Sequence, residues 1–272
     1  MTPTPERLVL LGHPLSHSLS PVLHNAALAA AGIKARYEAL DVPASALEIT
    51  LEELRRQRAA GNVTIPYKES VHAACDRLTD SARAVGAVNT FWTAVDGALI
   101  GDNTDVGGFG AAVARLTGGP RPNEIVALLG AGGAAAAVLR AMEGWPAATA
   151  RLYSRTRSRA ESLVKRFRVA SEIESSAEAA VAGATLVVNA TPVGLRDESV
   201  PVFVAALPTT AAVLDLAYRK DETALVRQAR ARGLKASDGL TMLVEQAALA
   251  FELWFGLAPD REVMWAAVGV RR

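Results

Sequence analysis

Short apolar strand-like segments alternate with helix-like segments along almost all of this 272-residue chain. We predict strands at residues 7–11, 35–41, 62–65, 89–95, 98–102, 124–129, 148–153, 185–189 and 213–216. We predict helices at residues 20–32, 44–57, 105–116, 132–142, 157–168, 223–232, 241–256 and 260–268. Strands that alternate with helices in this way pair in parallel and are covered by helices on both faces, so the predicted fold class is α/β.

The pattern divides into two α/β domains. The segment 118–122, Gly-Gly-Pro-Arg-Pro, has the composition of a linker, and a new series of strands and helices starts after it. The last two predicted helices follow no strand, so we expect them to return to the first domain. The predicted domains are residues 1–105 with 241–272, and residues 106–240.

Two dipeptides predict where elements begin or turn. Ser20-Pro21 is typical of a helix start, with the serine as N-cap and the proline at the first helical position. Asp96-Gly97 is typical of the tight turn of a β-hairpin, so we expect the strands on either side of it to pair antiparallel.

The charge balance conceals a gradient along the chain. The net charge is +1, which gives no general reason to expect a nucleic acid or an anionic membrane as partner. However, residues 1–105 carry −3, residues 106–240 carry +5 and residues 241–272 carry −1. Most of the positive excess lies within residues 151–168, which could bind an anion or form a solvated helix face.

Cysteine and histidine usage favours a cytoplasmic protein without a metal. Cys75 is the only cysteine, which excludes an internal disulfide and favours a reducing compartment. His72 lies three residues before it, but this pair lacks a second pair of ligands, and none of the four histidines has a convincing ligand set. The uncharged run at residues 125–139 is too short and too rich in glycine to span a membrane, and residues 1–7 lack the apolar core of a signal peptide.

A glycine-rich turn between a predicted strand and a predicted helix indicates a dinucleotide site. The segment Gly130-Ala131-Gly132-Gly133-Ala134-Ala135 fits the pattern G-x-G-x-x-A. The first glycine permits a tight turn, the second lets the backbone approach a pyrophosphate, and the small last residue lets the helix pack closely. Tight packing alone is the alternative, but the strand–turn–helix context favours binding in a Rossmann-type domain.

Arginines after the next predicted strand indicate which dinucleotide is bound. An acidic residue there would hold the ribose hydroxyls of NAD, whereas an arginine accommodates the extra phosphate of NADP. The chain has Ser154-Arg155-Thr156-Arg157-Ser158-Arg159 and no acidic residue before Glu161. Guanidinium groups bind phosphate through paired hydrogen bonds, so we predict NADP as the cofactor.

Three polar features of the first domain have both functional and structural interpretations. Ser18 and Ser20 lie just before a helix N-terminus, which suits a carboxylate ligand, although the spacing alone favours a loop hydroxyl for Ser18 and a helix cap for Ser20. Lys68 stands out because the chain has 5 lysines against 24 arginines, and lysine, unlike arginine, can release a proton. Asp105, taken alone, is more typical of a helix cap than of a catalytic carboxylate.

Seven ordered motifs that cover nearly the whole chain together resemble those of the shikimate dehydrogenase family. They are residues 12–25, Asn62-Val63-Thr64-x-Pro66-x-Lys68, Gly86-Ala87-Val88-Asn89-Thr90, Asn103-Thr104-Asp105, Gly130-Ala131-Gly132-Gly133-Ala134, Asn189-Ala190-Thr191-Pro192-x-Gly194, and Gly239-Leu240-x-Met242-Leu243 through Gln246. Seven motifs in order are far more specific than any one of them.

The resemblance implies an NADP-dependent oxidoreductase that interconverts shikimate and 3-dehydroshikimate in aromatic amino-acid biosynthesis, acting as a monomer or homodimer. It implies that Lys68 is a general acid and base paired with Asp105. The implied substrate residues are Ser18 and Ser20 for the carboxylate, Thr64, Asn89 and Gln246 for the hydroxyl groups, and Tyr218. The implied cofactor residues are Gly130, Ala131, Gly132, Gly133, Ala134, Ser154, Arg155, Thr156, Arg159, Thr191, Gly239 and Met242.

The chain departs from the family pattern at three places that concern cofactor binding or loop shape. The usual Asn-Arg-Thr is Ser154-Arg155-Thr156, an arginine common after the glycine-rich turn is Ala136, and Tyr218 lacks the usual nearby proline. Alternatives to the main prediction are an NAD(P)-dependent quinate/shikimate dehydrogenase and a non-catalytic NADP-sensing protein. A folate-linked dehydrogenase with two similar domains is a more distant alternative.

Overall fold

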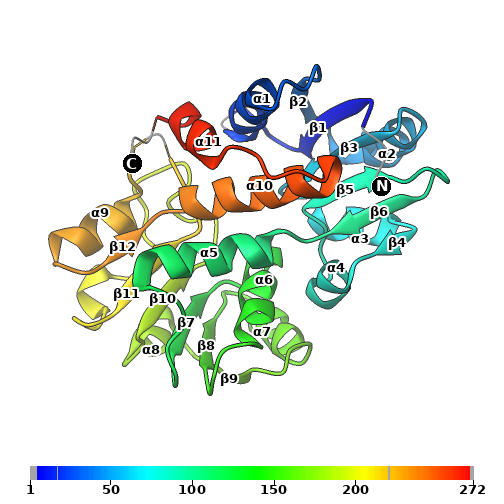
Figure 1. Cartoon of the computed structure of the whole chain (residues 1–272). Helices are drawn as coiled ribbons and strands as arrows, with labels where there is room; N and C mark the ends of the chain where they lie inside the picture. The colour runs from blue at the N-terminus through cyan, green and yellow to red at the C-terminus, as the bar shows by residue number, and fades with distance from the viewer. Residues whose placement is uncertain (1–4, 17, 220, 270–272) are drawn as a thin grey trace. The chain divides into compact units, whose positions relative to one another are not determined.

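The computed structural model describes residues 5–16, 18–219 and 221–269, and these form two α/β units (Figure 1). The first unit comprises the described residues up to Asp105 together with those from Leu243 onward, and the second comprises Val106–Met242. The helix α11 packs against α1 within the first unit. The predicted α/β fold, with a Rossmann-type unit and with C-terminal helices returning to the first unit, is confirmed.

The first unit is built on a mixed sheet of six strands in the order β2-β1-β3-β5-β6-β4. Its elements are β1 (Arg7–Gly12), α1 (Ser20–Ala30), β2 (Tyr37–Asp41), the 3₁₀ helix η1 (Ala44–Ala46), α2 (Leu47–Arg56), β3 (Ala59–Val63), α3 (Lys68–Ala74), β4 (Arg77–Leu78), α4 (Asp80–Val85), β5 (Thr90–Thr93), β6 (Leu99–Asp102), α10 (Leu240–Phe255) and α11 (Arg261–Ala267). The unit boundary falls near the start of α10, whose first residues belong to the second unit.

The second unit is built on a fully parallel sheet of six strands in the order β12-β11-β10-β7-β8-β9. Its elements are α5 (Asp105–Thr117), β7 (Ile125–Leu129), α6 (Gly133–Met142), β8 (Thr149–Tyr153), α7 (Arg157–Val164), β9 (Ala170–Ile173), α8 (Ala177–Val181), β10 (Leu186–Asn189), the 3₁₀ helix η2 (Val204–Ala206), β11 (Ala212–Asp215), α9 (Ala224–Ala231) and β12 (Ala236–Ser237). This is the doubly wound arrangement of dinucleotide-binding folds.

The strands at the centre of each sheet are buried on both faces, as parallel strands covered by helices must be. In β1 the residues Leu8–Leu11 are between 0% and 2% exposed, and in β7 the residues Val126–Leu129 are between 0% and 1% exposed. The edge strand β9 is instead exposed and half-buried in alternation. Each unit therefore has its own hydrophobic core around its central strands.

The helix starts show one correction to the sequence analysis. The prediction that Ser20 is an N-cap is wrong, because Ser20 is the first helical residue of α1 and the cap position is taken by Leu19, which provides no side-chain hydrogen bond. Side-chain caps occur at other helices: Thr79, Ser176 and Thr223 each accept a hydrogen bond from a backbone N–H in the first turn. The predicted hairpin at Asp96-Gly97 is confirmed, since β5 and β6 pair antiparallel around it.

The core of the first unit contains a fully buried histidine with a consequence for stability. The ring of His24 stacks on Tyr37 with centroids 4.3 Å apart and lies 5.1 Å from the ring of Trp254. Burial lowers the pKa of His24 from 6.5 to about 3. The unfolded chain therefore takes up this proton first as the pH falls, and the stability contributed by neutral His24 is lost between about pH 6.5 and pH 3.

We expect the wild-type protein to lose about 2–3 kcal/mol of unfolding free energy through His24 between pH 7 and pH 4.5. His24→Phe keeps an aromatic ring but cannot titrate, so its loss over this range should be smaller by that amount. Urea denaturation at the two pH values measures the difference. The control is His13→Gln, because the pair of His13 and Asp41 lies at the surface, with the side chain of His13 53% exposed, and contributes little to stability. This variant should retain most of the wild-type loss. Equal losses in wild type and His24→Phe would contradict the prediction.

Candidate functional site

The first unit gathers several predicted site residues at one edge of its sheet. Strands β1 and β3 are parallel neighbours, and β6 runs in the same direction because β5 is antiparallel to both β3 and β6. The carboxyl ends of β1, β3 and β6 therefore meet the amino end of β5. Thr64 follows β3, Asn89 precedes β5, and Asp105 lies three residues after β6. Ligands of α/β folds commonly bind at such an edge.

Close packing joins the segments that follow β1 and β3. A Cβ atom added to Gly12, at the end of β1, would lie 2.5 Å from Cγ2 of Thr64, so only glycine fits there. The segment after β1 also contains the predicted carboxylate-binding serines. The Oγ of Ser18 accepts a hydrogen bond of 3.3 Å from the backbone N–H of Ser20, which is 5% exposed.

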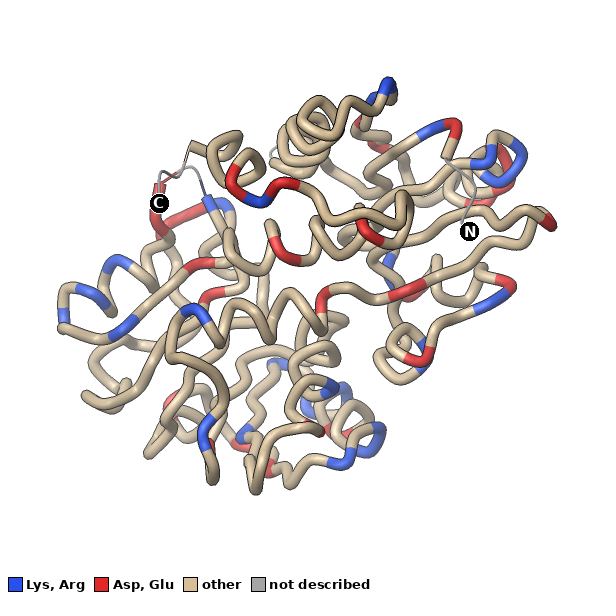
Figure 2. The backbone as a smooth tube through the Cα atoms, in the orientation of Figure 1, with Lys and Arg blue, Asp and Glu red and all other residues tan. Residues whose placement is uncertain are grey.

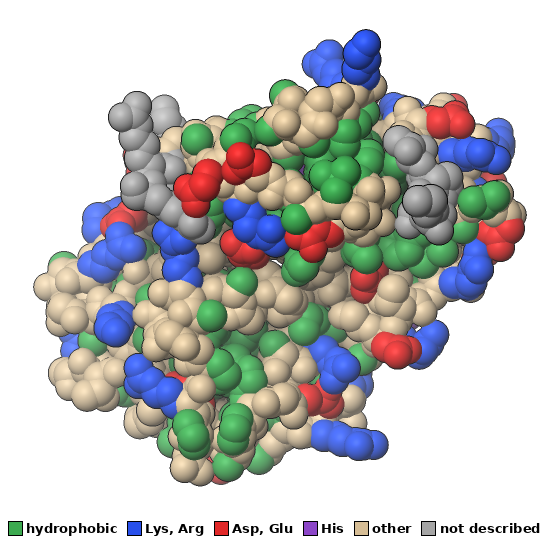
Figure 3. Space-filling model, in the orientation of Figure 1, with side chains coloured by type: hydrophobic (Ala, Val, Ile, Leu, Met, Phe, Trp, Pro, Cys, Tyr) green, Lys and Arg blue, Asp and Glu red, His purple; other side chains and the backbone are tan. Residues whose placement is uncertain are grey.

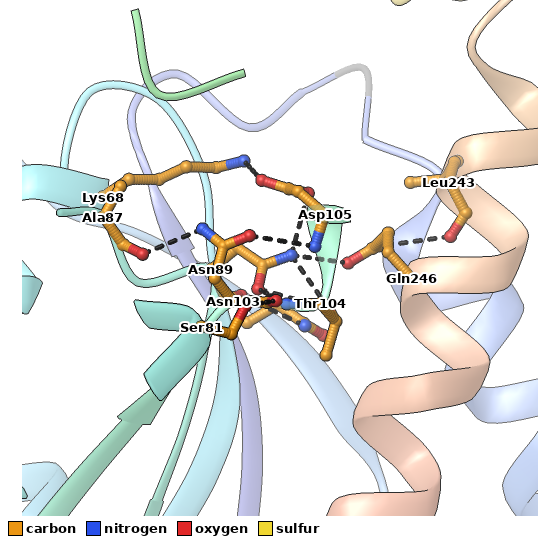
Figure 4. Close-up of polar contacts among 10 residues, drawn as sticks. Lys68, Ser81, Ala87, Asn89, Asn103, Thr104, Asp105, Leu243 and Gln246 are labelled. Atoms are coloured by element: carbon orange, nitrogen blue, oxygen red, sulfur yellow. Dashed lines mark hydrogen bonds and ion pairs between the residues drawn. The ribbon is translucent and has the colours of Figure 1, made fainter. Parts of the chain in front are cut away.

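Lys68 and Asp105 form an ion pair at this edge (Figure 4). The Nζ of Lys68, the first residue of α3, donates to Oδ2 of Asp105 over 2.6 Å. The side chain of Asp105 is 6% exposed and that of Lys68 is 22% exposed. The pair is thus largely shielded from water, and Lys68 is the more exposed of the two partners.

The carboxylate of Asp105 does not cap the helix that it begins. Its Oδ1 accepts a hydrogen bond of 2.8 Å from Nδ2 of Asn89, and its Oδ2 accepts from Lys68. The backbone N–H of Asp105 donates to the side chain of Asn103. The interpretation of Asp105 as a helix cap is therefore wrong, and both oxygens of the carboxylate are directed toward side chains of the site.

Asn89 is the centre of the polar cluster (Figure 4). Its Oδ1 accepts from the backbone N–H of Thr104 over 2.7 Å, which fixes the orientation of the amide. Its Nδ2 then faces three acceptors, at 2.8 Å in Asp105, 2.9 Å in Thr104 and 3.2 Å in Gln246. Gln246 comes from α10 and is itself held by a hydrogen bond from its Nε2 to the carbonyl oxygen of Leu243.

Two residues that support this cluster were not among the predicted site residues. Asn103 is 3% exposed and donates from Nδ2 to the carbonyl oxygen of Ala87, while its Oδ1 accepts from the backbone of Asp105. Thr104 is 5% exposed and bonds to Asn89 through both its N–H and its hydroxyl group. The sequence signals for these two residues were the motif Asn103-Thr104-Asp105 and the short polar side chains immediately before a helix, neither of which specified this supporting role.

The predicted substrate residues are only partly brought together. Lys68, Asn89, Asp105 and Gln246 form one hydrogen-bonded cluster. The same unit contains Ser18, Ser20 and Thr64. Among the described residues, none of these three has a hydrogen bond to that cluster. Tyr218 belongs to the second unit, where it is half-buried after β11.

The second unit places the glycine-rich turn at the point where its strand order reverses. β7 lies between β10 and β8, so the turn after β7 adjoins the segment that follows β10. Gly130 has a φ of +120°, and a Cβ atom there would lie 2.8 Å from the carbonyl oxygen of Ala190. A larger residue would therefore be strained and would collide with the neighbouring segment.

The start of α6 fits a pyrophosphate. Gly132 is the N-cap of this ten-residue helix and provides no side-chain hydrogen bond, so the first N–H groups of the helix have no side-chain cap. A Cβ atom added to Gly132 would meet no atom within 4 Å, which indicates open space in front of the helix. Uncapped N–H groups at a helix start form a common phosphate site. Ala131, Gly133 and Ala134 complete the turn.

The predicted 2′-phosphate residues follow β8, directly beside the glycine-rich strand. Ser154 accepts a hydrogen bond from the N–H of Thr156, which forms a tight turn before α7. Arg157 pairs with Glu161 over 3.0 Å, whereas Arg155 and Arg159 are exposed and their guanidinium groups have no polar partner among the described residues. Figure 2 shows basic residues gathered around α7. This surface suits an anion.

The remaining predicted cofactor residues lie at the carboxyl ends of the second sheet or just after it. Thr191 follows β10, and Gly239 follows β12. Met242 lies in the first turn of α10 and is 8% exposed. In the ranges that the structure describes, no three His, Cys, Asp or Glu side chains form a group that could hold a metal ion. None of the helices in those ranges is long and apolar enough to cross a membrane.

Two segments of the chain match family models of known proteins. Residues 10–91 match the model described as the shikimate dehydrogenase substrate binding domain. Residues 239–268 match the model described as the shikimate 5'-dehydrogenase C-terminal domain. The first segment contains Ser18, Ser20, Thr64, Lys68 and Asn89, and the second contains Gly239, Met242 and Gln246.

Similarity to whole proteins extends over nearly the full chain. An NADP(+) shikimate dehydrogenase of Thermus thermophilus is 44% identical over 262 residues, which are 93% of this chain and 94% of that protein. A shikimate 5-dehydrogenase of Thermus thermophilus, solved in complex with NADP(H) and shikimate, has a TM-score of 0.86 at 40% identity and covers 97% of this chain and 98% of that chain. Quinate dehydrogenase from Corynebacterium glutamicum, solved with NAD, has a TM-score of 0.85 at 31% identity, with 96% and 97% covered.

Proposed function

The chain belongs to the shikimate dehydrogenase family, and from this premise we propose that it catalyses the reversible, NADP-dependent reduction of 3-dehydroshikimate to shikimate. The observation that carries the proposal is the shielded pair of Lys68 and Asp105 at the edge of the first sheet, joined to Asn89 and Gln246. This pair places a proton donor beside groups that can hold a polyhydroxylated ring. The similarity to NADP-dependent relatives supports the cofactor.

Lys68 is the proton donor of the proposed reaction. Reducing a ketone requires a hydride at the carbon and a proton at the oxygen, and NADPH supplies the hydride when it is bound. The ammonium group of Lys68 gives its proton to the carbonyl oxygen and, in the oxidative direction, the amine takes the proton back. An arginine could not perform this step because it does not give up its proton in proteins.

Asp105 positions both the lysine and the substrate in this proposal. Its Oδ2 holds the ammonium group of Lys68 at 2.6 Å, which restricts the long lysine side chain. Its Oδ1 is held in turn by Asn89, so the carboxylate cannot rotate without breaking a hydrogen bond. We assign the hydroxyl groups of the ring to Asn89, Gln246 and Thr64, and the substrate carboxylate to Ser18 and Ser20.

The cofactor is assigned to the second unit and the substrate to the first. We propose that residues 1–105 with 241–272 bind the substrate and that residues 106–240 bind NADP. The open helix start at Gly132 supports the pyrophosphate position, and the exposed guanidinium groups of Arg155 and Arg159 support the 2′-phosphate position. Serine at position 154 replaces the family's usual asparagine, which removes one potential contact on the adenosine side.

We also propose a cytoplasmic enzyme that acts as a monomer or a homodimer and has no nucleic-acid partner. A single cysteine supports a reducing compartment. The net charge of +1 supports the absence of a nucleic-acid partner, because such partners require a strongly basic surface. On the face drawn in Figure 3, basic and acidic side chains are interspersed.

A rate assay with two substrates and two cofactors tests the proposal. We expect kcat/KM with shikimate and NADP to exceed that of every other combination by about tenfold or more, since the exposed arginines after β8 favour a cofactor with a 2′-phosphate and Ser18, Ser20 and Thr64 match the shikimate enzymes of the family. The other combinations are shikimate with NAD, quinate with NADP and quinate with NAD. Equal or better turnover of quinate with NAD would refute the proposal in favour of a quinate dehydrogenase. Such an enzyme is the second candidate, since a quinate dehydrogenase has a similar fold.

A non-catalytic NADP sensor on the same scaffold would give a different result. It would bind NADP in a titration calorimeter but turn over none of the four combinations. The paired Lys68 and Asp105 argue against it, because a sensor has no need of a shielded proton donor.

A further inference from the structure

A buried carboxylate in the second unit connects three loops at the carboxyl edge of the sheet. Asp215 is the last residue of β11 and is 0% exposed. β10 and β12 flank β11 and run parallel to it, and the register pairs Asn189 with Asp215 and Leu214 with Ser237. The loops that follow the three strands therefore start side by side.

Three hydrogen bonds converge on this carboxylate, one from the end of β10 and two from the connection between β11 and α9. The Nδ2 of Asn189, at the end of β10, donates to Oδ1 over 2.8 Å. The backbone N–H of Ala217, in the loop after β11, donates to the same oxygen over 3.1 Å. The hydroxyl group of Thr223, which caps α9, donates to Oδ2 over 2.7 Å. All three donors are neutral, so the carboxylate gains no cationic partner from them.

The connections continue from these partners into residues assigned to the cofactor. The Oδ1 of Asn189 accepts from the hydroxyl group of Thr191 over 2.6 Å and from its N–H over 3.0 Å. The carbonyl oxygen of Ala217 accepts from the N–H of Gly239 over 2.9 Å. A Cβ atom on Gly239 would lie 2.3 Å from the carbonyl oxygen of Leu216, so the third loop packs directly on the second.

A group whose charge is not stabilised by any cation is costly to bury. Burial raises the pKa of Asp215, and the neighbouring Asp238 adds to this effect. Among the described residues, its hydrogen-bond donors belong to the end of β10 and to the connection between β11 and α9, so the carboxylate ties these two segments together.

We propose that Asp215 is a positioning residue that orients Thr191 and Gly239 for NADP binding through Asn189 and Ala217. This inference rests on the proposed function, because it takes the cofactor positions from there. It assigns Asp215 no contact with the cofactor and no part in proton transfer. Loss of the carboxylate should therefore weaken NADP binding while kcat at saturating cofactor is retained.

The second unit offers a matched control at the opposite edge of its sheet. Glu124 is 3% exposed and precedes β7, and its carboxylate accepts from the hydroxyl group of Thr185 over 2.9 Å and from the N–H of Arg121 over 2.8 Å. It thus resembles Asp215 in burial and in its donors, a threonine hydroxyl and a backbone N–H. It differs in lying at the amino edge of β7, away from the loops after β10, β11 and β12.

Isothermal titration with NADP in the absence of substrate tests the proposal. We expect Asp215→Ala to raise the Kd for NADP by about tenfold or more, because three donors lose their acceptor and the loops relax. Glu124→Ala should lower the Tm about as much as Asp215→Ala does, but it should change the Kd for NADP by less than about twofold. Asp215→Asn should return the Kd to within about threefold of wild type, since its Oδ1 still accepts from Asn189 and Ala217.

A second pair of variants keeps the test decisive if Asp215→Ala does not fold. Thr223→Val removes one hydroxyl donor from Asp215, and Thr185→Val removes the corresponding donor from Glu124. We expect only Thr223→Val to raise the Kd, by about threefold. Folded Asp215→Ala or Thr223→Val with wild-type affinity would overturn the inference, and so would equal weakening in the Glu124 or Thr185 variants. Failure of wild type to bind NADP would instead refute the proposed function.

Discussion

Lys68→Ala is expected to lower kcat for shikimate oxidation by about 100-fold or more, while the KM values for shikimate and NADP change by less than about threefold. In the proposed mechanism the lysine supplies or accepts the proton at the reacting oxygen, and this interaction is made only in the transition state. Its removal therefore lowers kcat without removing the groups that hold the substrate. Steady-state kinetics in both directions measure the effect.

Two further variants separate proton transfer from charge. Lys68→Arg keeps a positive charge beside Asp105 but cannot release a proton, so its kcat should fall nearly as far as that of Lys68→Ala. Lys34→Ala removes an exposed lysine from the same unit and should retain wild-type kinetics. Near-normal kcat in Lys68→Ala would remove the lysine from the mechanism, and near-normal kcat in Lys68→Arg would show that charge alone suffices.

Arg155→Ala is expected to reduce kcat/KM with NADP by about 10- to 100-fold, because a hydrogen-bonded arginine–phosphate pair contributes about 1.5–3 kcal/mol. The value with NAD should change by less than about twofold, since NAD lacks the 2′-phosphate. Arg155 is exposed after β8 and has no polar partner within the described ranges. Its guanidinium group is therefore available for the phosphate without first breaking an ion pair.

The neighbouring Arg157 provides the control. Its guanidinium group is already engaged by Glu161 at 3.0 Å on the first turns of α7. Arg157→Ala removes the same charge from the same segment, and we expect it to reduce kcat/KM with NADP by less than about threefold. Equal losses of kcat/KM in the two variants would mean that the basic surface attracts NADP through its overall charge and that no single arginine binds the 2′-phosphate specifically.

The alternation of strands and helices could be predicted because it depends on short-range periodicity. The second unit is the clearest case, since each of its central strands is an apolar run that ends close to a glycine or polar turn. The strands of the first unit were harder to predict from the sequence. β3 was predicted at 62–65 but spans Ala59–Val63, where Ala59, Ala60 and Gly61 have little preference for strands. A Cβ atom on Gly61 would lie 2.1 Å from the carbonyl oxygen of Val9, so close packing on β1 selects this segment.

The bounds of the short elements around the site could not be predicted, for a related reason. The helices α3 and α4 have seven and six residues. In helices this short, the internal hydrogen bonds do not offset the free-energy cost of forming the first turn, so the helices depend on packing against the rest of the protein. Lys68 begins one of them, but the sequence contained no signal for how it would meet Asp105. That contact requires β3 and β6 to end at the same edge of a sheet, which depends on strand order. The supporting roles of Asn103 and Thr104 required the same information.

Asn89 faces more acceptors than it has hydrogen atoms to donate. Its amide nitrogen carries two hydrogen atoms, but the oxygens of Thr104, Asp105 and Gln246 all lie within 3.2 Å of it. Asn89 therefore serves at most two of the three acceptors with a full hydrogen bond at a time. In the proposed function, a ring hydroxyl group of the substrate donates to the third acceptor, and this requires no hydrogen bond of Asn89 to be given up.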